Sequence, residues 1–211
     1  MNIKELEKDT GTLSNPSKMP SHGHSTPAAD CITGSKLAKI AGSVCSKCYA
    51  RKGRYVFPNV QDAQRNRRDL LSSPRWVESM TELIRRREKS GHFRWKDSGD
   101  ISSVEELSNI VQVARNLPDI TFWLPTREYG IASKWVETFG KMPHNLIIRL
   151  SAYMIDGKPP TTLAKRLGVL TSTVSSDKQA ADCPAYKQGG ACGDCRRCWD
   201  SSVENVCYPQ H

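Results

Sequence analysis

The sequence predicts an α/β protein, a partial (β/α) barrel or a parallel sheet flanked by helices, with a Cys-rich C-terminal metal-binding segment. Strand-like and helix-like stretches alternate over short connections between residues 92 and 174, which is typical of βαβ units. Beyond this stretch the alternation stops, and four cysteines fall within sixteen residues. We therefore expect a core over residues 1–176, with an N-terminal loop and a three-cysteine site. A cluster-binding segment over residues 177–211 is expected to pack on that core.

Hydrophobic spacing and capping residues define the expected elements. Strands are predicted over residues 92–96, 120–124, 145–150 and 168–174. The helix signals are an N-cap, a Ser-Pro start, a capping box, and glycine or proline stops. They predict helices from Asn59 to Leu71, from Ser73 to Gly91, from Ser102 to before Pro118, and over 131–139 and 161–167.

Residues 9–30 are rich in Ser, Pro, Gly and Thr, which predicts an extended loop rather than a core element. His22 and His24 lie in this stretch. We interpret them as exposed loop histidines, with metal ligation as the alternative. No strand is evident before the first cysteines.

Length and hydropathy indicate how many domains to expect and whether the chain enters a membrane. A chain of 211 residues can form one well-buried domain. It has no run of eighteen apolar residues and no apolar stretch near its start, so neither a membrane span nor a secretory signal is expected. A cytosolic location follows, and in a reducing cytosol eight cysteines favour metal or redox chemistry over disulfides.

The positive charge is unevenly distributed. The chain has 31 Lys and Arg against 22 Asp and Glu, a formal charge of +9. The stretch from Arg51 to Lys96 alone holds thirteen basic and five acidic residues, so +8 comes from it. Such a stretch is a candidate footprint for nucleic acid. The alternative is a pair of solvated helices, because the run Arg85 to Arg87 suits the C-terminal turn of a helix.

The C-terminal cysteines have the spacing of a metal centre. Cys183, Cys192, Cys195 and Cys198 form C-x8-C-x2-C-x2-C, and nearby glycines ease the wrapping of the loop. Structural zinc usually takes two separated C-x-x-C pairs, whereas a tandem repeat is more typical of iron–sulfur ligation. We expect a 4Fe–4S cluster, with zinc as the alternative. The fourth ligand is either Cys183 or Cys207.

A second group consists of Cys31, Cys45 and Cys48. Three thiolates on a 4Fe–4S cluster leave one iron open, as an enzyme needs when a substrate or cofactor binds the metal. Cys207 is the candidate that would close this site instead. Cys31 also has the alternative of a small buried apolar residue.

Polar residues follow each predicted strand, at the edge where parallel α/β folds place their sites. After the first strand come Ser98, Gly99 and Asp100, which could approach a ligand closely and accept from an amine or hydroxyl. The alternative for Asp100 is to help start the next helix. After the second strand, Arg127 could bind a carboxylate or phosphate, and the alternative is a surface pair with Glu128.

Several stretches carry a resemblance to a known family. They are "SKMP", "CSKCYARKGRYVFPNVQDAQRNRRDLL", "FRWKDSGD", "FWLPTRE" and "CGDCRRCWDSSVENVCYPQH". These stretches resemble the gene product 88 family of bacteriophage proteins, and the resemblance covers most of the chain. It implies a phage or prophage origin and a site of action in the bacterial cytoplasm.

The cysteines also resemble those of the radical S-adenosylmethionine enzymes. That superfamily uses a full or partial (β/α) barrel and holds a 4Fe–4S cluster with C-x3-C-x2-C, whose open iron chelates the cofactor. Cys45-x2-Cys48 followed by Tyr49 is similar to the second half of that motif, with Cys31 at a spacing of thirteen instead of three. The turn Ser98-Gly99-Asp100 is similar to the Gly-Gly-Glu turn that binds the cofactor's amino group. The superfamily often carries an auxiliary cluster near the C-terminus.

These resemblances lead to a hypothesis about function. It is an iron–sulfur enzyme with one or two 4Fe–4S clusters and S-adenosylmethionine as cofactor. Ser98, Gly99, Asp100 and Tyr49 would bind the cofactor, and Asp100, Arg127 and Glu128 would be catalytic. A nucleotide or nucleic acid is the expected substrate, a reductant protein the expected partner, and no membrane is expected. The alternative is a non-enzymatic, metal-stabilised protein that binds nucleic acid or a host regulator.

Overall fold

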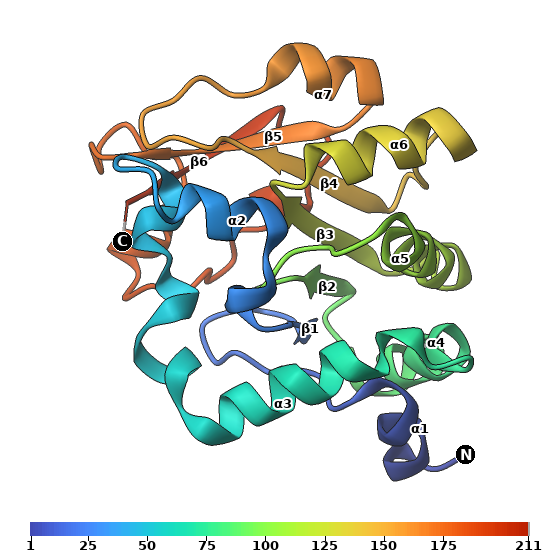
Figure 1. The fold of residues 1–211 in the computed structure, drawn as a ribbon. Coiled ribbons are helices and arrows are strands. Elements are labelled where there is room, and N and C mark those ends of the chain that lie inside the picture. The colour runs from blue at the N-terminus through green and yellow to red at the C-terminus, as the bar shows by residue number, and fades with distance from the viewer. Residues whose placement is uncertain (211) are drawn as a thin grey trace.

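Six parallel strands form one sheet, and their order in the sheet is their order in the chain (Figure 1). The computed structural model describes residues 1–210. Each strand pairs only with its neighbours in sequence, so the sheet runs from β1 at one edge to β6 at the other. The strands are β1 (Gly23–His24), β2 (His92–Trp95), β3 (Thr121–Thr126), β4 (Leu146–Ser151), β5 (Leu170–Ser175) and β6 (Asn205–Pro209).

Helices cover one face of this sheet. Crossovers between parallel strands are right-handed, so a sheet whose strands follow chain order carries its crossover helices on a single face. Figure 1 shows these helices side by side, and each packs against the next along the chain. They are α4 (Trp76–Arg87), α5 (Val104–Asn116), α6 (Tyr129–Phe139) and α7 (Thr161–Leu167). The prediction of an α/β fold with a parallel sheet flanked by helices is confirmed.

The hydrophobic core lies between the sheet and these helices. Alternate strand residues such as Phe93, Trp95 and Phe122 point into it and are fully buried. The apolar stripe of α5 meets them, because Leu107 and Ile110 recur at helical spacing on its inner face. Full burial of each such side chain contributes about 1.5–3 kcal/mol.

The opposite face of the sheet is covered by the C-terminal segment. Arg149 of β4 points to this face, has no exposed surface, and donates to five backbone carbonyl oxygens at 2.8–3.2 Å. Four of these carbonyls belong to residues 197–203, and the fifth belongs to Thr171 of β5. Trp199 also attaches the C-terminal segment to the sheet, because its Nε1 donates to the carbonyl of Phe93 at 2.9 Å.

The prediction of a plain loop over residues 9–30 is wrong at β1, which forms a strand of the sheet. Gly23 and His24 pair with Arg94 and Trp95 of β2. His24 is buried, with its ring edge-on to Trp76 and Trp95 at centroid distances of 5.8 Å. The expectation of an exposed histidine is therefore wrong for His24. A strand of two residues has no periodicity, so composition alone indicated a loop.

Other elements also differ from the prediction. Strand β6 joins β5 although its sequence lacks a strand-like rhythm, and the final residue of the predicted segment 177–211 lies outside the described part. Helix α5 begins one residue late, because the Ser103 hydroxyl accepts from the N–H of Glu106. Three further helices are α1 (Ile3–Thr10), α2 (Ile32–Leu37) and α3 (Pro58–Asp69). Within residues 1–210, none of the helices has both the length and the apolar character needed to cross a membrane.

Candidate functional site

The first cysteine group lies in the connection that follows β1. Cys31 caps α2, Cys45 lies in a short 3₁₀ turn over Val44–Lys47, and Cys48 ends that turn. The Ser43 hydroxyl donates to the carbonyl of Leu37 at 2.5 Å and accepts from the N–H of Ser46 at 3.0 Å. These bonds fold the fourteen-residue separation between Cys31 and Cys45 into a compact turn.

Gly34 shows how closely the first group converges. A Cβ at Gly34 would stand 3.5 Å from the Sγ of Cys31 and 3.7 Å from the Sγ of Cys45. The same Cβ would lie 2.9 Å from the Cβ of Cys31, closer than real contacts allow. The two sulfurs thus border one small space, which any larger residue at position 34 would fill.

The thiols of this group share a common electrostatic environment. Burial raises the pKa of the Cys31 thiol to about 12, and Asp100, Cys48 and Cys45 add to the rise. Burial also raises the pKa of Cys45, while Arg127 opposes the rise. Several groups that would be anionic together are brought to one place, and a bound cationic centre is what would stabilise their thiolates.

Asp100 lies at the carboxyl edge of the sheet, next to this group. Its Oδ1 accepts from the Thr126 hydroxyl at 2.6 Å, and its Oδ2 accepts from the N–H of Arg127 at 2.8 Å. Burial raises the pKa of Asp100 to about 6, although these bonds oppose the rise. The carboxylate therefore ties the ends of β2 and β3 together beside Cys31.

Ser98 and Gly99 precede Asp100 in the same turn. The backbone of Gly99 has a φ of +77°, and a Cβ there would stand 2.7 Å from the carbonyl oxygen of Thr26. The close approach that requires a glycine is thus made by the chain itself, at the segment that leaves β1. Ser98 is buried, and its hydroxyl has no hydrogen-bond partner within residues 1–210. Within that part of the chain, the hydroxyl is a buried polar group without a partner beside Asp100.

Arg127 and Glu128 follow β3 and support the first group. Both oxygens of the buried Glu128 carboxylate accept from Thr33, one from its N–H and one from its hydroxyl, each at 2.7 Å. The alternative of an Arg127–Glu128 surface pair is wrong, because Glu128 is buried and holds the start of α2. The Nε of Arg127 donates to the carbonyl of Ala152 at 3.2 Å.

Tyr49 connects the two cysteine groups. Its hydroxyl donates to the carbonyl of Asp97 at 2.6 Å and accepts from the Nη2 of Arg94 at 3.1 Å. The Arg94 guanidinium lies over the ring of Trp123, 4.4 Å from its centroid. Arg94 in turn opposes the rise in pKa of both Cys192 and Cys198, which places its charge beside the second group.

The second cysteine group gathers on the face of the sheet that Arg149 occupies. The N–H of Cys195 donates to the carbonyl of Cys192 at 3.1 Å, which closes the first C-x-x-C turn. Burial raises the pKa of Cys183, and Cys192 and Cys195 add to the rise. Burial raises the pKa of Cys198 to about 11, with Cys183 contributing and the Tyr208 hydroxyl opposing at 3.1 Å from its sulfur. Four thiols therefore lie within electrostatic reach of one another.

Cys207 lies next to the second group, because its carbonyl accepts from the N–H of Cys183 at 3.1 Å. It lies on β6, opposite Thr173 of β5. Its sulfur contacts the carbonyl of Tyr208 at 4.0 Å. Cys183 also lies close to Cys192 and Cys195, because both raise its pKa.

A single metal ion and an iron–sulfur cluster need different arrangements of the cysteine side chains. Within residues 1–210, no group of three or more His, Cys, Asp or Glu side chains is arranged so that it could hold a metal ion. A 4Fe–4S cluster makes a different demand, because each thiolate binds its own iron and the sulfurs stand farther apart than around one ion. Thiolates are the ligands that such a cluster takes, and both groups offer thiols alone.

The segment before β1 reaches the second group. The carbonyl of Lys18 accepts from the N–H of Cys192 at 2.9 Å, and its Nζ donates to the carbonyl of Gly189 at 2.8 Å. Met19 places its sulfur 3.2 Å from the Nη1 of Arg94. The "SKMP" stretch therefore supports the second group from outside.

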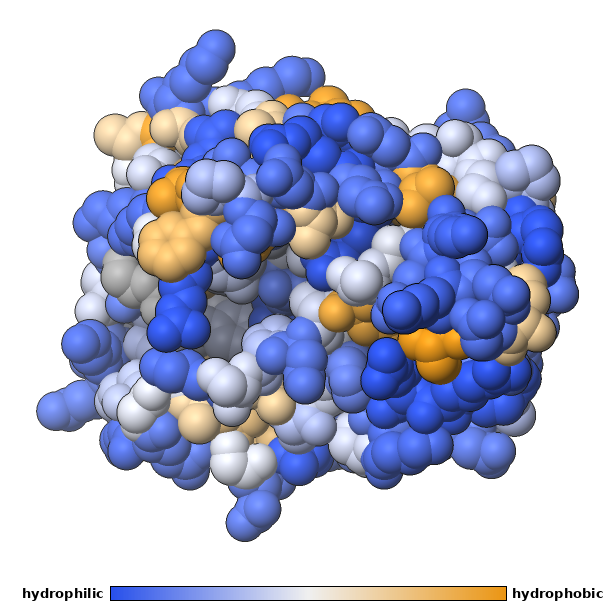
Figure 2. Space-filling model, turned by 90° about the horizontal axis from the view of Figure 1, so that it is seen from below, coloured by the Kyte–Doolittle hydropathy of each residue, from blue (hydrophilic) through white to orange (hydrophobic). Residues whose placement is uncertain are grey.

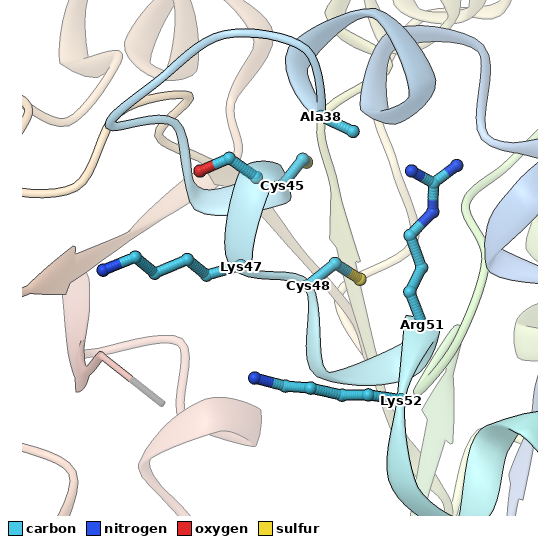
Figure 3. A pocket seen from close by; sticks show the side chains of 7 residues that line it. Ala38, Cys45, Lys47, Cys48, Arg51 and Lys52 are labelled. Carbon is cyan, nitrogen blue, oxygen red and sulfur yellow. The ribbon is translucent and has the colours of Figure 1, made fainter.

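A surface pocket opens at the first group. It has a volume of about 310 Å³ and is lined by Cys45 and Cys48 together with Lys47, Arg51 and Lys52. Figure 3 shows the Cys48 sulfur turned toward the side on which Arg51 stands, while Lys47 and Lys52 extend to the other side. Two of the three thiols therefore border an opening that cations surround.

Comparison with known proteins places the chain in a family. The family model for gene product 88 matches residues 2–201, nearly the whole chain. The chain belongs to the gene product 88 family. The match supports a phage origin, and it includes seven of the cysteines but not Cys207. Comparison with curated proteins gave no match for this gene product 88 protein, and comparison with solved structures gave none either.

Proposed function

We propose that this gene product 88 protein is an iron–sulfur enzyme of the radical S-adenosylmethionine type. One observation carries the proposal. Cys31, Cys45 and Cys48 converge in the connection after β1, beside the carboxyl ends of the strands, with no fourth cysteine among them. Three thiolates with an adjoining pocket are the arrangement that leaves one iron accessible.

The form of the sheet supports the proposal. Its strands follow chain order and its helices cover one face, as in a (β/α) barrel that has not closed. In such folds the loops at the carboxyl ends of the strands build the site. Cys31, Ser98, Asp100 and Arg127 all come from these loops.

The residues of the first site have separate tasks under this proposal. Cys31, Cys45 and Cys48 would hold the cluster, and Gly34 leaves the space it needs. Glu128 fixes the start of α2 through Thr33. When bound, a reduced cluster with S-adenosylmethionine supplies the electron that starts radical chemistry. Ser98 offers a buried hydroxyl without a partner to the cofactor.

The second group would hold an auxiliary cluster. Cys183, Cys192, Cys195 and Cys198 provide four thiols, so no iron stays open. The Tyr49–Arg94 contact joins the two groups, and the cation of Arg94 would stabilise the negative charge of the thiolates. This site would pass electrons or keep the C-terminal segment folded.

Anaerobic purification with iron, sulfide and zinc analysis tests the proposal. We expect a brown protein with about eight irons per chain, four in each cluster. Cys45→Ser and Cys48→Ser should each reduce the count to about four and abolish both binding and cleavage of S-adenosylmethionine. Cys207→Ser is the matched control and should keep both.

Two outcomes would overturn the proposal. A colourless protein that contains zinc would remove the radical chemistry and favour the alternative of a metal-stabilised nucleic-acid-binding protein. Unchanged cofactor cleavage in the Cys45→Ser variant would show that the first group is not the reaction centre.

A further inference from the structure

The basic residues of the stretch from Arg51 to Lys96 fall into two classes. Most of those on the helices are paired with neighbouring carboxylates, and Arg67 is buried and donates to Thr12 and Ser25 instead. Arg85 and Arg86 both bond to Glu82, and Arg65 bonds to Asp62. In all, six arginines lie 2.5–3.9 Å from a carboxylate oxygen, namely Arg65, Arg68, Arg75, Arg85, Arg86 and Arg87. These helices therefore carry less free positive charge than their sequence indicates.

The segment that carries the first cysteine group has the opposite character. Residues 31–61 contain six basic residues and no Asp or Glu. The six are all exposed, and within residues 1–210 none of them forms an ion pair. They are Lys36, Lys39, Lys47, Arg51, Lys52 and Arg54. The segment that carries the first group thus has six exposed cations, unpaired within the described residues, and no carboxylate of its own.

Three of these cations line the pocket itself. Lys47, Arg51 and Lys52 share its wall with the thiols of Cys45 and Cys48 (Figure 3). These cations lie on opposite sides of the pocket and have no anionic partner in the described part of the chain, so an anion in the pocket would be attracted from both sides. A phosphate group bound there would lie beside the proposed reaction centre.

Apolar side chains stand next to the cations. Val56 is 46% exposed and Phe57 is 53% exposed, immediately before α3. An exposed aromatic ring beside cations is the combination that binds single-stranded nucleic acid, through base stacking and phosphate contacts. Figure 2, which views the molecule from below, shows a mostly hydrophilic face that is hollowed on one side, with hydrophobic residues only in small separate patches.

We propose that this rim binds single-stranded nucleic acid and presents it to the first cysteine group. The inference rests on the proposed function, because it takes that group as the reaction centre. A base paired within a duplex could not reach the thiols at the pocket, whereas an unpaired base can. An acidic partner protein is a weaker fit, since the three cations line a hollow that its surface would not enter.

The salt dependence of binding measures how many phosphate groups the protein contacts. For single strands, log K falls with log salt by about 0.7 per phosphate neutralised, so three contacts give a slope of roughly −2. The protein, purified anaerobically with its metal, would be titrated into a fluorescein-labelled single-stranded 20-mer and followed by anisotropy. The same sequence as a duplex and a mononucleotide provide the comparison ligands.

Charge-matched variants locate the surface. The triple variant Lys47→Gln, Arg51→Gln, Lys52→Gln should weaken binding at least tenfold and flatten the slope to near zero. The control Arg65→Gln, Arg85→Gln, Arg86→Gln removes the same charge from paired arginines and should change affinity less than threefold. Phe57→Ala should weaken binding several-fold with the slope of the salt dependence unchanged. Because Phe57 does not line the pocket, this variant still tests the surface if the first triple variant loses its iron.

The outcomes separate this inference from the proposed function. Equal weakening by both triple variants, preference for the duplex or the mononucleotide, or no binding by a protein with full iron content would overturn the inference and leave the enzyme proposal standing. Salt-dependent single-strand binding by a protein without iron would support the surface while removing the reaction centre.

Discussion

The two cysteine groups differ in how the fold holds them and in what surrounds them. The first has three cysteines, borders an open pocket and stands among exposed cations. The second has four, lies against the sheet, and belongs to a segment fixed by a fully buried arginine. Thiol chemistry is the same in both, so the surroundings decide which group can receive a ligand.

The supports of the two groups differ as well. Glu128 holds the first group by accepting from Thr33 alone, at the start of a six-residue helix. Arg149 holds the second by donating to five carbonyls at once. The first group is therefore held by a buried carboxylate that accepts at the start of a helix, and the second by a buried cation that donates to several loop carbonyls.

The largest expected effect comes from breaking the support of the second group. Arg149→Met would leave five carbonyls without their charged donor, and we expect a loss of roughly 3–5 kcal/mol in the free energy of unfolding. Urea unfolding of the purified protein measures it. Arg166→Met, at an exposed position on α7, is the control and should stay within about 0.5 kcal/mol. A loss below about 1 kcal/mol for Arg149→Met would contradict the assigned role.

The next effect separates the two groups by their iron. Gly34→Ala places a methyl group between the sulfurs of Cys31 and Cys45, so we expect about four irons to be lost and the second cluster to stay. Gly130→Ala is a matched control, because Gly130 also lies in a helix but has open space around its Cβ position. That variant should keep all its iron and gain about 0.5–1 kcal/mol of stability. Full iron content in Gly34→Ala would refute the convergence of the first group on a cluster.

A smaller effect should follow from loosening the support of the first group. Glu128→Gln keeps the shape of the side chain but removes the charge that accepts from Thr33. We expect a loss of about 1.5–3 kcal/mol and slower uptake of iron by the first group. Differential scanning calorimetry and time-resolved iron reconstitution measure the two. Glu137→Gln, at an exposed position on α6, should change neither. Slower uptake by the second group instead would contradict the assignment.

The smallest effect is a pH dependence of the free energy of unfolding that arises from His24 on β1. Burial, and then Lys96 and Arg67, lower the pKa of His24 well below its usual value, so the folded protein keeps this ring neutral. The unfolded chain binds a proton below about pH 6.5, so stability falls as the pH falls. From about pH 7.5 to about pH 5.5 we expect a loss of about 1.4 kcal/mol from this group.

Thermal unfolding across this pH range, with His24→Phe as the comparison, isolates the effect. The variant should lose this fall in stability with acid, while the opposing contribution of Asp100, whose pKa is raised to about 6, stays in both proteins. Because the first group follows β1 directly, acid should release its iron before that of the second group. Identical pH profiles for the two proteins would assign the dependence to other residues.

Much of the fold was predictable from the sequence because the long elements are periodic. The strand at 120–124 and the helix after Ser102 follow alternation or helical spacing, and both exist close to the predicted bounds. The two edge strands were missed for a physical reason. Gly23–His24 is too short to show a period, and Asn205–Pro209 has three apolar residues in a row before a proline, so it shows no alternation.

The cysteine groups could also be predicted from the sequence, but the side chains that hold them in place could not. Arg149 lies in "NLIIRL", where alternation suggests a polar residue facing water. It is buried because residues 197–203, far along the chain, bring carbonyls to it. The neutralised arginines were only partly predictable. The pairs of Glu82 with Arg85 and Arg86 follow from helical spacing, but the bond between Arg68 and Asp30 depends on tertiary contact.

The attachment through Arg149 also has a consequence for synthesis on the ribosome. Four of its acceptors come 48 to 54 residues later in the chain. At about 5–20 residues per second, the nascent sheet waits several seconds with one face uncovered. Trp123 and the guanidinium of Arg149 stay exposed during that interval. Closure of this face and assembly of the second cysteine group are then a single late event. Under the proposed function, chains made without iron would therefore keep this face open to proteases.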